Sequence, residues 1–146
     1  MSNPVQTRKE LLKDLGKKGR EFIARVILSN QKIAEQIGIN TIDLQCLNMI
    51  DLLGGEAKPG EIAKMTGLTT GGVTVMLDRL EKKGYIERKP NPKDRRSTLI
   101  HLSPKKMSKL HAVYESQALS MEKILSNYTD EELSIIIDYF SKTLSA

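Results

Sequence analysis

Several features that mark other protein classes are scarce in this sequence of 146 residues. It holds one cysteine, no tryptophan and 4% aromatic residues. A single cysteine cannot form an internal disulfide, so the chain is not a disulfide scaffold, and this usage suits the cytoplasm. The two histidines lie far from each other and from that cysteine, without the spacing of a structural zinc site. We therefore predict neither a metal nor a cofactor.

Long apolar runs are also missing. No run approaches the roughly 20 residues that cross a bilayer, so no membrane partner is expected. Residues 1–7 turn polar at once, unlike a signal peptide. Charged residues make up 28% and hydrophobic residues 39%, which is the mix of a folded soluble protein. The length fits one domain, and the core is expected to consist of Leu, Ile, Val and Met.

Positive charge gathers in one stretch of the chain. The whole chain carries a net charge of +5, but the stretch from Arg79 to Lys109 has eleven basic and three acidic residues, a net of +8. Such a concentration is typical of a surface that meets phosphates. The alternative is a lysine-rich face that serves only solubility.

The first half of the sequence reads as helices. Residues 7–37 repeat apolar side chains at helical spacing and would span about 45 Å, longer than one small domain can cover. Asn40 or Thr41 can cap a second helix, 42–53, which Gly54 and Gly55 end. Its inward residues are predicted to be Ile42, Leu47, Ile50 and Leu53.

A helix-turn-helix pattern follows. Pro59 suits the first turn of a short helix, 59–66, and residues 66–68 form a tight turn. Thr69 can cap a further helix, 70–83, which Gly84 ends. Residues 85–89 and 97–102 are strand-like and flank a turn-rich break at 90–94, which predicts a β-hairpin with a long basic tip. The predicted fold class is mainly α with a small β-hairpin wing: a winged helix-turn-helix.

Two more helices complete the pattern. Ser103 and Pro104 open one of them, and Thr129 with Glu132 forms a capping box for the last. The apolar stripes on 7–37, 107–125 and 133–144 exceed what one winged-helix lobe can cover. Exposed patches of that size mark an interface, and a two-fold homodimer is the simplest closed solution.

Two groups of residues are the candidate DNA contacts. Small residues on the outer face of helix 70–83 would enter the major groove, while Val73, Met76, Leu77 and Leu80 face the core. On the hairpin, cations suit the narrow minor groove of A·T tracts. Asp94 either pairs with a nearby arginine and shapes the tip, or satisfies its own backbone. The candidate sites are Thr69, Thr70, Gly71, Gly72, Thr74, Val75 and Arg79 on the helix, and Lys89, Lys93, Asp94, Arg95 and Arg96 on the wing.

Residues from about 58 to 106 resemble the MarR family of winged-helix transcriptional regulators. The resemblance rests on the segments Glu61–Thr69, Val73–Ile86 and Asn91–Ser97, and on the step Leu102-Ser103-Pro104. The order of the flanking helices also fits, so it extends over nearly the whole chain. It implies an N-terminal dimerisation helix at 1–38, a DNA-binding lobe at 39–103 and C-terminal dimerisation helices at 104–146.

The resemblance also implies a function. A homodimer would bind double-stranded DNA at a pseudo-palindromic operator and repress nearby genes until a small ligand or an oxidant releases it. Thr69, Thr70 and Thr74 would face DNA from the recognition helix, and Arg96 would enter the minor groove with Asp94 as its orienting partner. Many members have arginine where this chain has Val75, and valine can contact a thymine methyl but cannot read guanine.

Other functions find less support in the sequence. Cys46 lies among apolar residues, with Asp43 as the nearest charge, so a buried thiol is favoured over an oxidant sensor. No nucleophile elbow, metal-protease helix or paired-carboxylate motif is present, and an enzyme is not predicted. A winged-helix adaptor that binds only proteins is the second hypothesis, although it has no reason to keep the +8 stretch.

Overall fold

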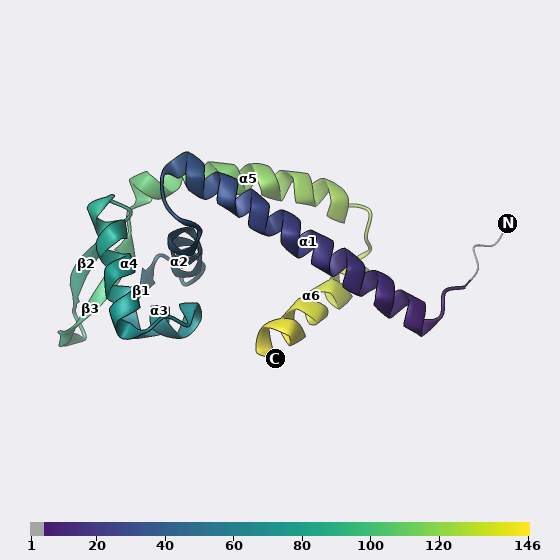
Figure 1. Ribbon diagram of the computed structural model, residues 1–146, viewed down its shortest axis with the longest axis horizontal. Helices are drawn as coiled ribbons and strands as arrows, with labels where there is room; N and C mark the ends of the chain where they lie inside the picture. The colour runs from purple at the N-terminus through teal and green to yellow at the C-terminus, as the bar shows by residue number, and fades with distance from the viewer. Residues whose placement is uncertain (1–4) are drawn as a thin grey trace. The chain divides into compact units, whose positions relative to one another are not determined.

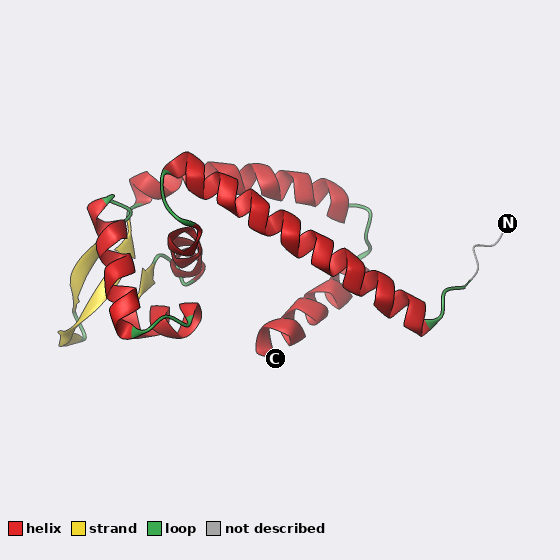
Figure 2. Cartoon of the chain, viewed as in Figure 1, coloured by secondary structure: helices red, strands yellow, loops and turns green. Residues whose placement is uncertain are grey.

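The computed structural model describes residues 5–146, which form six α-helices and three β-strands (Figure 1, Figure 2). The chain divides into two compact units, one ending at Leu102 and the other comprising Ser103–Ala146. The first unit contains α1 to α4 and the sheet, and the second contains α5 and α6. Nothing in the described part is both long and apolar enough to make a membrane-spanning helix.

Helix α1 (Arg8–Ile37) is confirmed as one long helix. The Thr7 hydroxyl accepts from the Glu10 amide, and the Glu10 carboxylate accepts from the Thr7 amide, which completes a capping box. Gly38 ends the helix with a left-handed φ of 75°. Within α1, Ile33 and Ala34 are the buried residues, so most of its apolar stripe is exposed in the single chain.

Helix α2 (Thr41–Leu52) begins after Asn40, whose Oδ1 accepts from the Asp43 amide at 2.8 Å. Its buried residues include Leu47 and Ile50, as predicted. The prediction for Ile42 and Leu53 is wrong, because they are 53% and 47% exposed. The buried face is rotated toward Asp43, Leu44 and Cys46, and this rotation leaves the flanking positions in solvent.

Helices α3 (Pro59–Thr66) and α4 (Thr70–Lys82) form the predicted helix-turn-helix. Gly67 takes a φ of 69° in the turn between them. The Thr66 hydroxyl donates to the Ile62 carbonyl at 2.7 Å and accepts from the Leu68 amide at 3.3 Å. Thr69 then caps α4 by accepting from the Gly72 amide at 3.1 Å. Thr66 therefore orders the turn that presents the start of α4.

The wing is an antiparallel pair that belongs to a three-stranded sheet of order β1-β3-β2. The strands are β1 (Glu56–Ala57), β2 (Ile86–Asn91) and β3 (Asp94–Leu102). The predicted break at 90–94 is wrong in extent, because Pro90 pairs with Thr98 and Asn91 with Asp94. The tip is therefore a tight turn at Pro92 and Lys93, with a register shift between Pro90 and Asn91. Strand β1 was not predicted.

The core of the first unit lies where α2, α3, α4 and β3 meet. Its fully buried side chains include Leu44, Leu47, Ile50, Ile62, Met76, Leu77, Leu80 and Ile100. Burial of one such side chain contributes about 1.5–3 kcal/mol. This core holds the inner face of α4 and turns its outer face to solvent. Methionine was expected in the core, but Met49 and Met121 are 39% and 43% exposed.

The second unit consists of α5 (Pro104–Leu125) and α6 (Asp130–Ser145). Ser103 caps α5 with Pro104 in its first turn, and Thr129 with Glu132 forms the predicted capping box of α6. No residue of α6, all of which is described, is buried in the single chain. Large apolar side chains of this unit are exposed, among them Leu119, Ile124, Ile135, Ile137, Phe140 and Leu144.

Candidate nucleic-acid interface

The outer face of α4 is free, small and uncharged at its start. Thr70, Gly71, Thr74 and Val75 are exposed, whereas Val73, Met76, Leu77 and Leu80 are buried as predicted. The first turn of α4 contains no acidic residue, so nothing there offsets the partial positive charge of the helix start. Such an end attracts an anion, above all a phosphate.

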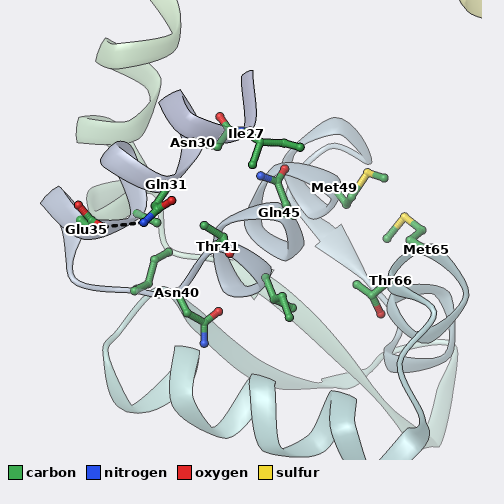
Figure 3. Close-up of a pocket in the computed structure, with 13 residues that line it drawn as sticks. Ile27, Asn30, Gln31, Glu35, Asn40, Thr41, Gln45, Met49, Met65 and Thr66 are labelled. Atoms are coloured by element: carbon green, nitrogen blue, oxygen red, sulfur yellow. Dashed lines mark hydrogen bonds between the residues drawn. The ribbon is translucent and has the colours of Figure 1, made fainter. Parts of the chain in front are cut away.

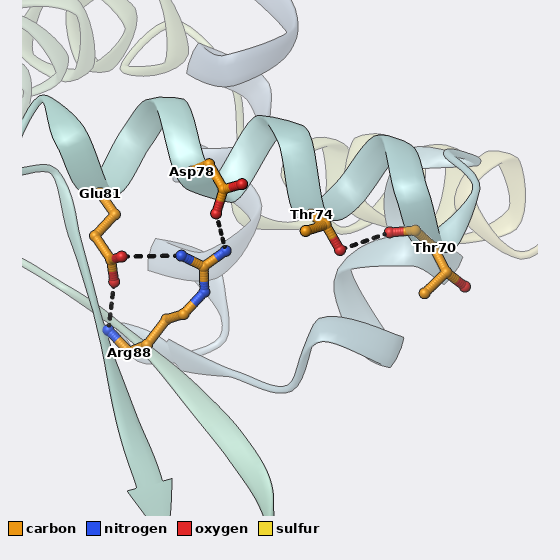
Figure 4. A network of polar contacts seen from close by, with 5 residues as sticks. All are labelled: Thr70, Thr74, Asp78, Glu81 and Arg88. Carbon is orange, nitrogen blue, oxygen red and sulfur yellow. Dashed lines mark hydrogen bonds and ion pairs between the residues drawn. The ribbon is translucent and has the colours of Figure 1, made fainter.

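Thr70 and Thr74 lie one turn apart on this face (Figure 4). The Thr74 hydroxyl donates to the Thr70 carbonyl at 3.0 Å, which leaves the oxygen lone pairs and the methyl group of Thr74 for an outside partner. This bond also fixes the rotamer of Thr74. The face can therefore accept hydrogen bonds and make apolar contacts without any cation of its own.

Arg79, which was predicted to contact DNA, forms an ion pair within the lobe. Its Nε and Nη2 donate to the two carboxylate oxygens of Asp43 at 3.1 and 2.8 Å, a bidentate pair that joins α4 to α2. Asp43 is 1% exposed, and Arg79 is the cation that pairs with it. The hydrogen bonds and charge of Asp43 raise the pKa of Arg79. The structure thus makes Arg79 a tether within the lobe.

Cys46 is the buried thiol that the sequence predicted, one turn after Asp43. Burial, with a further contribution from the Asp43 charge, raises the pKa of Cys46 to about 12. A thiol with such a pKa is almost fully protonated at neutral pH and is a poor nucleophile.

A polar cluster that the sequence did not reveal joins the wing to α4 (Figure 4). The guanidinium of Arg88, on β2, pairs with Asp78 at 2.7 Å and with Glu81 at 2.9 Å. The Arg88 amide also donates to Glu81 at 3.2 Å. Asp78 and Glu81 follow Thr70 and Thr74 along α4, so Arg88 neutralises two carboxylates beside the candidate DNA-binding face.

Internal hydrogen bonds order the tip of the wing. Asn91 is buried, donates to the Ser97 hydroxyl at 3.0 Å and accepts from the Lys93 amide at 3.0 Å. Asp94 accepts from the Arg96 amide at 3.0 Å, and the Ser97 hydroxyl donates to the Asp94 carbonyl. The second of the two interpretations of Asp94 is therefore the one observed: it bonds the backbone, and no arginine of the described chain pairs with its carboxylate.

The cations of the tip point into solvent. Lys93, Arg95 and Arg96 are exposed, and none of them forms an ion pair within the part of the chain that the structure describes. Lys89, farther from the turn, lies 3.5 Å from Glu87. Lys93, Arg95 and Arg96, which have no ion-pair partner among residues 5–146, lie at a narrow hairpin tip next to an uncharged helix face. Together they form a surface suited to a grooved polyanion.

Comparisons with known proteins agree with this architecture. A family model described as the MarR family matches residues 37–97. The HTH-type transcriptional regulator YcgE of Bacillus subtilis is 35% identical over 93% of this chain and 88% of its own length. The crystal structure of transcriptional regulator Tm0710 from Thermotoga maritima is 28% identical and superposes with a TM-score of 0.65, covering 91% of this chain and 93% of that one.

A further solved structure shares the fold. It is a cysteine-to-serine variant of MarR from E. coli complexed with operator DNA, 24% identical, with a TM-score of 0.60 over 95% of this chain and 99% of that one. The extent of the match to YcgE, together with the family model over the helix-turn-helix and wing, establishes the family of this chain. The chain belongs to the MarR family of winged helix-turn-helix transcriptional regulators.

Proposed function

We propose that this regulator acts as a homodimeric repressor that binds a pseudo-palindromic operator and is released by a small ligand. In each protomer α4 enters the major groove through Thr69, Thr70, Gly71, Gly72, Thr74 and Val75, and the wing places Lys93, Arg95 and Arg96 in the neighbouring minor groove. The observation that carries this proposal is the set of wing-tip cations, which form no ion pair with any described residue, beside the exposed, uncharged face of α4.

The helix and the wing would make different contacts with DNA, because they carry different chemical groups. The helix face offers hydroxyls, methyl groups and backbone amides, which contact base edges and nearby phosphates. The wing offers guanidinium groups, which respond to groove width and phosphate charge more than to base identity. Recognition by this protein therefore depends on A·T-rich flanks read by the wing as well as on bases read by the helix.

The dimer follows from apolar surface that the single chain leaves in solvent. Phe22 and Ile23 of α1, with Ile137 and Phe140 of α6, are all more than half exposed. A stable monomer rarely exposes so much apolar surface. A two-fold assembly through α1, α5 and α6 covers it and presents two copies of α4 to the two halves of an operator.

Release by a small ligand is supported by a cavity within the first unit. Residues of α1, α2 and α3 line a space of about 670 Å³. This lies in the size range of small-molecule sites. The lining includes Thr66, which orders the turn before α4. A ligand in the cavity would therefore contact a residue that positions the DNA-binding face.

DNA binding is tested by fluorescence anisotropy with A·T-rich duplexes taken from DNA beside the gene, between 50 and about 200 mM salt. A repressor of this kind binds with a steep salt dependence, and a double variant, Arg95→Ala with Arg96→Ala, lowers both the affinity and the salt slope. The matched control replaces Lys13 and Lys17, exposed cations of α1, and should leave both unchanged. Light scattering should give twice the mass of one chain. Absence of DNA binding by a folded dimer would favour the adaptor hypothesis instead.

A further inference from the structure

The cavity between α1, α2 and α3 has an unusual balance of charge for a site in a basic protein (Figure 3). Glu35 is the one acidic side chain among its lining residues, and no lysine, arginine or histidine lines it. The rest of the lining is apolar or neutral. It comprises Ile27, Asn30, Gln31, Ala34, Ile39, Asn40, Thr41, Ile42, Gln45, Met49, Met65 and Thr66.

Glu35 is available to an outside cation. Its carboxylate accepts from Gln31 Nε2 at 3.1 Å, and no cation among the described residues pairs with it. The last turn of α1, where Glu35 lies, also has no basic residue. Carbonyl groups at a helix end carry partial negative charge, which adds to the charge of the carboxylate.

The opposite side of the cavity is apolar and consists of flexible side chains. Met49 of α2 and Met65 of α3 lie together there, across from Gln31 and Glu35 of α1 (Figure 3). Methionine side chains are flexible and polarisable, so they adapt to aromatic or alkyl groups. The cavity thus combines an apolar wall with one carboxylate and several amide oxygens.

We propose that this cavity binds a lipophilic organic cation, with its charge toward Glu35 and its apolar groups against Met49 and Met65. An anionic ligand of the same shape is disfavoured, because its charge would lose hydration without gaining a cationic partner. This inference rests on the proposed function, since it names the class of ligand that would release the repressor.

The contacts around the cavity also indicate how a bound ligand would change the affinity for DNA. Thr66 forms part of its wall and bonds the Leu68 amide, directly before the residue that caps α4. At the other end of α4, the Lys83 ammonium donates to the Gly38 carbonyl, and the Tyr85 hydroxyl donates to the Ile37 carbonyl at 3.2 Å. A ligand that separates α1 from α3 therefore acts on both ends of α4.

Binding is tested by calorimetry on the full chain without DNA, with tetraphenylphosphonium and tetraphenylborate as probes of equal shape and opposite charge. We expect the phosphonium to bind at least tenfold more tightly than the borate.

Glu35→Gln should weaken binding of the phosphonium about tenfold, whereas Glu21→Gln, which removes an acid from the same helix outside the cavity, should have no effect. Gln45→Trp, a change at an exposed position of the lining, should fill the cavity and abolish binding. Binding of the phosphonium that survives Gln45→Trp, or an equal affinity for both probes, would overturn the inference.

A second measurement separates this inference from the proposed function. Anisotropy with operator DNA should show that the phosphonium lowers DNA affinity at least fivefold and that DNA lowers phosphonium affinity by the same factor. Thr66→Val, which removes the bonds to Ile62 and Leu68, should reduce this factor. If DNA binds but the cation does not, the ligand class is wrong and the repressor function stands. If the cation binds and DNA does not, the repressor function fails alone.

Discussion

Replacing Arg88 by methionine should weaken DNA binding, even though Arg88 is assigned no contact with DNA. In the folded chain its guanidinium neutralises Asp78 and Glu81 at 2.7 and 2.9 Å. Methionine keeps much of the aliphatic bulk but leaves both carboxylates unpaired beside the face that carries Thr70 and Thr74. Two uncovered negative charges would then face the phosphates.

The size of the effect follows from Coulomb's law. One carboxylate and one phosphate about 10 Å apart repel each other by about 0.4 kcal/mol in bulk water, and by more where water is excluded. Two such pairs cost about 0.8 kcal/mol, or roughly fourfold in affinity, for each half-site, so the four pairs of a dimer lower the operator affinity roughly sixteenfold. The loss of folding stability should be only about 1 kcal/mol, because Asp78 and Glu81 are largely exposed and such pairs contribute little.

The assay is fluorescence anisotropy at two salt concentrations, with urea unfolding measured in parallel. The loss of affinity should shrink as salt rises, because the repulsion is screened over about 10 Å at 0.1 M. Adding Asp78→Asn and Glu81→Gln to Arg88→Met should restore DNA affinity but not stability. Arg25→Met, which breaks a comparable exposed pair with Glu21, is the control and should not affect DNA binding. A triple variant that still binds DNA poorly would show that Arg88 acts only by holding the wing in place, and the electrostatic reasoning would be refuted.

Four further outcomes are expected. Thr74→Ala should relax sequence preference by about 1–3 kcal/mol at one base pair and leave the salt slope unchanged, as measured with a panel of single-base operator variants. Arg96→Ala should weaken binding to all sequences and lower the salt slope by about one unit in the same titrations; an unchanged affinity would remove the wing from the DNA contact. Phe140→Glu should lower the mass measured by light scattering from that of a dimer toward that of a monomer, and it should also reduce the affinity for DNA. The pKa of Cys46 is raised to about 12 in the folded chain, so the stability supplied by its neutral thiol is present below pH 9 and falls as pH rises, by about 1.4 kcal/mol per unit. Urea unfolding should show this slope between pH 9 and 11 but not between pH 8 and 9, and Cys46→Ala should lack it.

The sequence predicted most of the secondary structure because the signals that set helix ends are local. Thr7, Asn40, Thr69 and Thr129 accept from amides three residues ahead, and all four were identified as helix caps or helix starts. The inward face of α4 was also predicted, since apolar spacing along one helix is visible in the chain. What remained hidden depends on contacts between elements.

Three residues illustrate that limit. Arg79 looked like a free cation of the recognition helix because its partner, Asp43, lies 36 residues away in sequence. Arg88 was not recognised as the partner of Asp78 and Glu81, because their contact depends on how β2 leaves the end of α4. Asp94 had two interpretations in the sequence, and only the geometry of the tight turn, with its bond to the Arg96 amide, separates them.

Two adjacent glycines in the first turn of α4 affect the kinetics of recognition. Glycine is about 0.8–1.0 kcal/mol less favourable than alanine within a helix, so Gly71 and Gly72 weaken the turn that we propose meets DNA. Part of the association free energy is then used to order this turn, which shortens the lifetime of the complex. A Cβ at Gly71 would meet open space, whereas one at Gly72 would lie 3.3 Å from the Thr69 hydroxyl that caps the helix. Residue 71 is therefore the position at which a side chain would strengthen this turn and leave the Thr69 cap intact, although it would also add a group to the face that we propose enters the groove.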